Sequence, residues 1–189
     1  MTAEEFWEYC GWVEFGDRKL ELVRGEVVET PLTGILHGTI CVWVGNLLIE
    51  HSLNGGSYNV ASNNVLLLLR RHPDTVRGPD LVVFDGNPFR EPPETFFSTT
   101  PLLLAVEVLG EDDSVEGVND RVSDLMAYGT PLIWIIDPVN GRITVHSDER
   151  AILLEDGDEL VGAGRFSGFR HSVQEIMSGP DYRWKHQPS

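Results

Sequence analysis

The chain has 189 residues, of which 41% are hydrophobic and 9% aromatic, a composition typical of a globular domain rather than of a disordered segment. It carries 14 Lys and Arg against 30 Asp and Glu, and this formal net charge of −16 argues against a protein that binds nucleic acid through a broadly basic surface. Apolar runs such as Val65–Leu69 are far too short to span a bilayer, so we expect no membrane association.

The N-terminal segment predicts a short helix followed by a hairpin. Residues 2–10 are amphipathic, with Thr2 as the N-cap and Glu5 at the capping-box position. Residues 18–29 alternate around an Arg-Gly turn, which favours a β-hairpin between 18–23 and 26–29. The acidic start of the chain also predicts that no secretory signal or transit peptide is present.

A long helix and a series of strands are predicted next. Thr33 or Gly34 begins the helix, which runs to about Leu53 and carries one apolar stripe. That stripe contains Ile40, Val44, Leu47 and Leu48. Strands are predicted at 57–60, 65–69, 80–84, 102–109, 131–137, 142–146, 152–154 and 159–161. Helices are predicted at 118–128 and 171–177, and a loop at 85–100.

The order of these elements predicts one mixed α/β domain over residues 1–178, followed by a flexible tail over 179–189. We expect a central mixed sheet flanked by helices, with an N-terminal hairpin and a C-terminal antiparallel meander. The two cysteines, Cys10 and Cys41, fall in helical segments without metal-binding spacing. We therefore expect buried thiols in a reducing compartment, and a cytoplasmic protein.

Two predicted strands each contain one acidic residue within an apolar run. Asp80 lies in GPDLVVF and Glu107 in LLLAVEVL. Burying a lone charge costs several kcal/mol or more unless the charge is paired or binds a cation. The pattern therefore indicates a shared cation, Mg²⁺ above all because it prefers hard oxygen ligands. The alternative is two unrelated acids at strand ends that face solvent or pair with arginine.

The chain resembles a bacterial family of putative restriction endonucleases, abundant in cyanobacteria, with the PD-(D/E)xK nuclease core. The resemblance covers nearly the whole sequence. It rests on TAEEFWEY, KLELVRGEVVE with Glu21, P-x-x-x-x-x-H with His37, GPDLVVF with Asp80, LAVEVLG with Glu107, AYGTPLIWIIDPVNGRITVH and DELVGAGRFSGF.

This resemblance implies a restriction-endonuclease-like fold and phosphodiester hydrolysis that depends on one or two Mg²⁺ or Mn²⁺ ions. Asp80 and Glu107 would hold the metal. Glu21 would be a further acid in the same pocket, unless it is a hairpin residue facing solvent. His37 would contact phosphate, pair with an acid, or serve in capping or packing.

The sequence departs from the family pattern at the motif lysine. Leu109 occupies the usual position, and the family's lysine looks shifted onto the following helix, at the position of Asp124. A carboxylate there would add negative charge to the pocket and oppose a phosphodiester. Arg121, on the same helix, and Lys19, on the strand of Glu21, are the two candidates to replace the missing ammonium.

Two functions therefore remain open. The first is an endonuclease, acting on DNA in preference to RNA and working as a homodimer. The second is a catalytically degenerate nuclease fold that serves as a binding or regulatory module. Arg70, Arg71 and Arg77, with His72 beside them, form the basic cluster in the sequence where nucleic acid could bind; the alternative is a solvated loop.

Overall fold

A six-stranded sheet forms the centre of the protein. The computed structural model describes residues 1–12, 19–30, 33–63, 65–86 and 97–179. The strand order is β10-β9-β8-β7-β6-β3; β7 and β8 run parallel, and the other neighbours are antiparallel. The strands are β3 (Asn59–Ser62), β6 (Leu81–Phe84), β7 (Leu102–Val108), β8 (Leu132–Asp137), β9 (Arg142–Ser147) and β10 (Ala151–Leu154). This confirms the expected mixed α/β fold.

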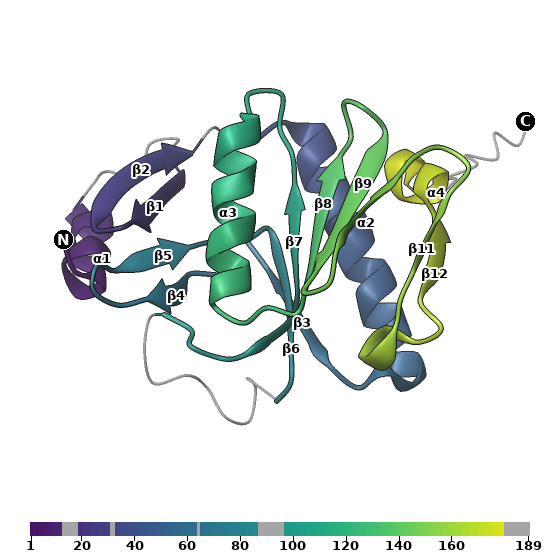
Figure 1. The fold of residues 1–189 in the computed structure, drawn as a ribbon, viewed down its shortest axis with the longest axis horizontal. Coiled ribbons are helices and arrows are strands. Elements are labelled where there is room, and N and C mark those ends of the chain that lie inside the picture. Colours follow the sequence, from purple (N-terminus) through teal and green to yellow (C-terminus); the bar gives the residue numbers. More distant parts are fainter. Residues whose placement is uncertain (13–18, 31–32, 64, 87–96, 180–189) are drawn as a thin grey trace, which may run out of the picture.

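Helices cover both faces of this sheet (Figure 1). The helix α3 (Val115–Ala127) lies on one face, and α2 (Ile35–His51) and α4 (Val173–Ser178) lie on the other. Successive residues of a strand point to opposite faces. In β7, Leu104 and Val106 pack in the cluster of α2, whereas Ala105 packs in the cluster of α3. Glu107 therefore shares the face that α3 covers.

A second, four-stranded sheet lies beside the first, with order β2-β1-β5-β4. It consists of β1 (Lys19–Val23), β2 (Glu26–Thr30), β4 (Leu67–Arg70) and β5 (Thr75–Arg77), and α1 (Ala3–Trp12) precedes it. The predicted hairpin and capping box are both present: Thr2 N donates to Glu5 Oε2 at 2.8 Å, and Glu5 N donates to Thr2 Oγ1 at 3.2 Å.

The strand β5 was not predicted, because three residues ending in an arginine give no apolar run. All three are buried between β1 and β4. The helix α3 begins at Val115, three residues before its predicted start, because the Ser114 side chain caps it by accepting from Gly117 N at 3.1 Å.

The C-terminal part differs from the expected meander in one strand. β9 and β10 pair antiparallel as expected, but β11 (Glu159–Val161) pairs with β12 (Arg170–Ser172) in a separate two-stranded sheet. Short helical turns at Ser52–Gly56 and Gly164–Phe166 complete the elements.

Parts of two expectations lie outside the described residues: the tail from residue 180, and positions 87–96 of the expected loop. The division into one domain and a tail stays a prediction. Within the described ranges, no helix combines the length and the apolar character needed to cross a membrane.

Candidate active site

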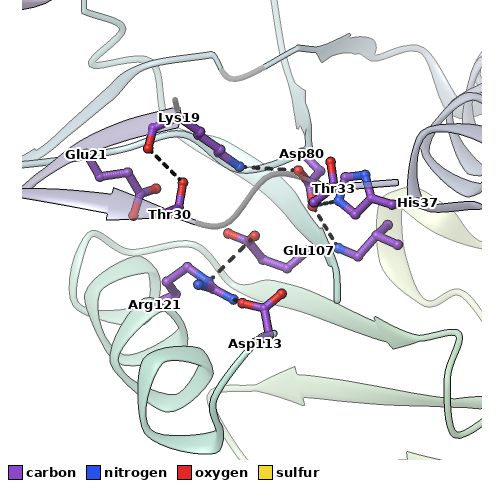
Figure 2. Close-up of a pocket in the computed structure, with 10 residues that line it drawn as sticks. Lys19, Glu21, Thr30, Thr33, His37, Asp80, Glu107, Asp113 and Arg121 are labelled. Carbon is purple, nitrogen blue, oxygen red and sulfur yellow. Dashed lines mark hydrogen bonds and ion pairs between the residues drawn. The ribbon is translucent and has the colours of Figure 1, made fainter. Parts of the chain in front are cut away.

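Asp80 and Glu107 lie side by side where β6 begins and β7 ends. Leu81 pairs with Val106 in this antiparallel pair, and continuing the register places Asp80 opposite Glu107. Both side chains line one small pocket beneath the N-terminal hairpin, and they are 8% and 4% exposed (Figure 2). The structure thus brings together the two carboxylates that the sequence pattern singled out.

Three groups hold the Asp80 carboxylate in place. Lys19 Nζ lies 3.4 Å from Oδ1, His37 Nε2 lies 3.1 Å from Oδ2, and Val108 N donates to Oδ2 at 2.8 Å. They come from β1, α2 and β7, so the position of Asp80 depends on three separate parts of the fold. His37 therefore takes one of its expected roles, pairing with an acid.

Glu107 has fewer partners than its burial would require. Its Oε2 lies 3.8 Å from Arg121 Nε, which is an ion pair but too long for a hydrogen bond. Its Oε1 is buried and, among the described residues, has no hydrogen-bond partner. Arg121 is fixed by Asp113, whose Oδ1 accepts from Arg121 NH2 at 2.5 Å and whose Oδ2 accepts from Gly110 N at 2.8 Å.

The environments of the two carboxyl groups shift their pKa values in opposite directions. Burial, followed by the nearby Asp80 carboxylate, raises the pKa of Glu107 to about 8, against the opposing effects of Arg121 and Lys19. Burial also acts to raise the pKa of Asp80, but His37, Lys19 and the Val108 amide together hold it below its usual value. Two neighbouring carboxyl groups with pKa values shifted in opposite directions are typical of catalytic sites, although structural ion pairs also produce such shifts.

Glu21 also lines the pocket, yet both of its oxygens are occupied. Arg77 NH1 donates to Oε2 at 2.8 Å, and Gly78 N donates to Oε1 at 2.9 Å. The Glu21 side chain is 1% exposed, which excludes the alternative of a solvated hairpin residue. Glu21 is thus a lining residue of the pocket, and Arg77 and the Gly78 amide already bind its carboxylate.

The expectation that Asp124 adds charge to the pocket is wrong. Its Oδ2 accepts from Arg77 Nε at 3.0 Å and from Arg77 NH2 at 2.6 Å, and Asp124 is not among the residues that line the pocket. One turn of α3 separates it from Arg121, which does reach the pocket. The guanidinium of Arg77 neutralises Asp124 instead, and no sequence pattern indicates this pairing between residues 47 positions apart.

The predicted basic cluster does not form one surface. Arg77 is 5% exposed and enclosed by Glu21 and Asp124, so it is not available to a phosphate. Arg71 pairs with Glu4 and Asp74 beside α1. Arg70 is exposed. Arg77 is separated from the other arginines because it belongs to β5, a strand that was not predicted, and is buried in the small sheet.

Several pocket residues had no signal strong enough to predict them. Asp113 was one of many acids in an acidic stretch, and Thr30 and Thr33 belong to no motif. Cys41 could have been found, because it follows His37 by four residues on a helix and so shares its face. Its Sγ lies 3.6 Å from His37 Nδ1, and burial, with Asp80 nearby, raises the pKa of the thiol to about 12.

The donors in this pocket fit a divalent cation. Glu107 Oε1 is a buried carboxylate oxygen without a partner among the described residues, and Asp80 lines the same pocket. The pocket leaves about 20 Å³ of free space, which suits one water molecule or one ion. Carboxylate oxygens are the ligands that Mg²⁺ and Mn²⁺ prefer.

Comparisons with known proteins show a similar fold and a family. The fold is similar to the crystal structure of a putative nuclease belonging to DUF820 from Anabaena variabilis ATCC 29413, with a TM-score of 0.77 and 18% sequence identity. That similarity covers 94% of this chain and 98% of the other. No curated protein matches the sequence. The family model Uma2, described as "Putative restriction endonuclease", matches residues 3–174, and the chain therefore belongs to this family.

Proposed function

We propose that this protein is a metal-dependent endonuclease that hydrolyses phosphodiester bonds. The observation that carries the proposal is the juxtaposition of Asp80 and Glu107 in one small pocket, with the Lys19 ammonium 3.4 Å from Asp80. Asp80 and Glu107 would hold one Mg²⁺ or Mn²⁺ ion, which is the number that the free space of about 20 Å³ suits. A bound ion of this kind polarises a phosphoryl oxygen and lowers the pKa of an attacking water.

Lys19 supplies the positive charge that the family's motif lysine would provide. It reaches the pocket from β1, two residues before Glu21, and its side chain is 20% exposed. From there the ammonium can stabilise the charge that develops on the phosphoryl oxygens and orient a water molecule. Arg121 is less suited to this role, because Asp113 and Glu107 already bind it.

The other residues position these groups. His37 and the Val108 amide orient Asp80, and Arg121 anchors Glu107. Thr33 places a hydroxyl group at the pocket, where it can donate to a phosphate oxygen, whereas Thr30 Oγ1 already donates to Lys19 O at 3.1 Å. The substrate we propose is nucleic acid, DNA in preference to RNA, bound locally at this pocket rather than through a basic surface.

The alternative, a degenerate nuclease fold with a binding or regulatory role, rested in part on Asp124. Since Arg77 neutralises Asp124 outside the pocket, that part of the case is lost, and the net charge of −16 and the presence of two lysines in the whole chain remain in its favour. The cytoplasmic location, inferred from two unpaired cysteines, stays a prediction.

The first test is nicking of supercoiled plasmid. We expect the protein to nick DNA with Mg²⁺ or Mn²⁺ and to stop when EDTA is added, because Asp80 and Glu107 cannot act without the ion. Lys19→Ala should slow nicking roughly 10²- to 10³-fold, the usual effect of removing one donor that stabilises the transition state.

Arg150→Ala is the control, since Arg150 is an exposed cation that is not among the residues lining the pocket. It should nick at the wild-type rate. Nicking by Lys19→Ala that equals the wild type, or nicking that persists in EDTA, would contradict the proposal.

A homodimer is proposed as well, because α2 carries an exposed apolar stripe on the side away from the sheet. Ile35, Val42 and Ile49 follow at seven-residue intervals and are 90%, 75% and 48% exposed. Thr39 and Asn46 lie between them, so this stripe has no carboxylate in a chain with 30 acids. A second copy fits the stripe, because two such faces meet without bringing like charges together.

Light scattering coupled to size exclusion tests this. The wild type is expected at twice the chain mass of 21.1 kDa, and Val42→Asp at the mass of one chain. Val161→Asp, a matched change at another exposed valine that is 51% exposed, should leave the dimer intact. A wild type that elutes with the mass of one chain would rule the dimer out.

A further inference from the structure

His37, which lines the pocket, and Cys41, which lies behind it on the same helix, bring nitrogen and sulfur donors close to Asp80. They lie four residues apart on α2, with Cys41 Sγ 3.6 Å from His37 Nδ1. His37 Nε2 lies 3.1 Å from Asp80 Oδ2. With one ligand atom taken from each of the three residues, all these atoms lie within 4.8 Å of one another. The side chains are therefore close enough to share one ion.

These donors suit a different metal from the one proposed for Asp80 and Glu107. Mg²⁺ takes hard oxygen ligands and does not favour a thiolate or an imidazole. Zn²⁺ and Co²⁺ bind sulfur, nitrogen and carboxylate oxygen together, and three protein ligands leave one position open. A helix that presents two ligands at i and i+4 supplies them on the same face.

The surroundings favour a cation at this position. Four carboxylates line the pocket, those of Glu21, Asp80, Glu107 and Asp113, against the two cations Lys19 and Arg121. His37 is 11% exposed and lines the pocket, so an ion can reach it from solvent. Zinc binding would replace the contact between His37 and Asp80 and release the thiol proton of Cys41 to solvent.

We propose that His37, Cys41 and Asp80 form a site for a thiophilic divalent ion such as Zn²⁺, and that this ion inhibits the enzyme. Asp80 is the shared ligand. When it is bound to zinc beside α2, it is not free to hold Mg²⁺ with Glu107. The binding of zinc stands on the geometry alone, whereas the inhibition rests on the proposed endonuclease function.

Cobalt spectroscopy tests the binding directly. Co²⁺ added to the metal-free protein should give a thiolate-to-cobalt charge-transfer band, and one equivalent of Zn²⁺ should remove it. Cys41→Ser should lack the band. His37→Gln should weaken Co²⁺ binding about 10- to 100-fold or more. The matched control is Cys10→Ser on α1, which should keep the band.

Alkylation of the wild type gives a second measurement that needs no variant. Zn²⁺ should protect Cys41 from iodoacetamide, as mapped by mass spectrometry, while Cys10 serves as the internal reference. No charge-transfer band in the wild type, a band that persists in Cys41→Ser, or labelling of Cys41 that proceeds without zinc and is not slowed by zinc would overturn the site.

Inhibition is measured separately, as the Zn²⁺ concentration that halves Mg²⁺-dependent nicking. This concentration should rise at least about 10-fold in Cys41→Ser, in line with the loss of a metal ligand. Glu107→Gln should keep the cobalt band, because Glu107 is not a ligand of this site. A band without any nicking would refute the endonuclease and leave the zinc site standing, whereas nicking without a band would do the reverse.

Discussion

Glu107→Gln is expected to abolish metal-dependent nicking. Glu107 provides the buried, unpartnered oxygen of the pocket, and an amide cannot replace its charge at a cation. The loss of a metal that stabilises the transition state by several kcal/mol corresponds to a rate decrease of roughly 10³-fold or more. Plasmid nicking in Mg²⁺ and Mn²⁺ measures it. Glu155→Gln, at an exposed acid, is the control that should retain full activity.

The same substitution is expected to change the pH dependence of stability without metal. The pKa of Glu107 is raised from 4.5 to about 8 in the folded state. Between these values the folded protein binds more protons at this group than the unfolded chain does, so this group makes the free energy of unfolding fall as pH rises from about 4.5 to 8. The glutamine has no charge to bury and lacks this contribution.

Urea unfolding in EDTA, at several pH values between 5 and 9, tests the direction in which the free energy of unfolding changes with pH. The stability of Glu107→Gln relative to wild type should increase with pH and level off above pH 8. Millimolar Mg²⁺ or Mn²⁺ should raise the melting temperature of the wild type and leave that of the variant unchanged. A variant that nicks DNA at the wild-type rate, or a wild type that is insensitive to both ions, would show that Glu107 is not a metal ligand.

Arg77→Met is expected to cause the largest loss of stability. Arg77 is buried and binds two acids, Glu21 at 2.8 Å and Asp124 at 2.6 Å and 3.0 Å. Removing the guanidinium leaves those carboxylates without their cation in a site that water hardly reaches. Breaking a buried ion pair in this way costs about 3–5 kcal/mol. Urea unfolding measures it as a lower midpoint.

The control is Arg170→Met, at an ion pair with Glu159 in which both side chains are about half exposed. Such a surface pair contributes about 0.2–1 kcal/mol. Adding Glu21→Gln and Asp124→Asn to Arg77→Met should recover part of the loss, because the unpaired charges are then removed with their partner. Equal stability of Arg77→Met and wild type would mean that the triad does not support the fold.

Sequence patterns predicted the long elements and also the short strands β10 and β11. The apolar runs of β7 and β8 and the stripe of α2 are each set by neighbours in the chain, so their burial follows from the pattern. The three residues of β5 are a strand because β1 and β4 flank them. Thr75, Val76 and Arg77 include one apolar residue, which is too little to indicate a strand without those neighbours.

For the candidate site, too, part follows from the sequence and part only from the tertiary structure. The sequence by itself singled out Asp80 and Glu107, because a lone carboxylate in an apolar strand needs a partner wherever it folds. Only the tertiary structure decided which charges meet them. Lys19 reaches Asp80 across 61 positions and Arg77 reaches Asp124 across 47, and both pairs depend on how the small sheet packs against α3 and the large sheet. Ion pairs over such separations are set by the packing of whole elements, which local sequence does not encode.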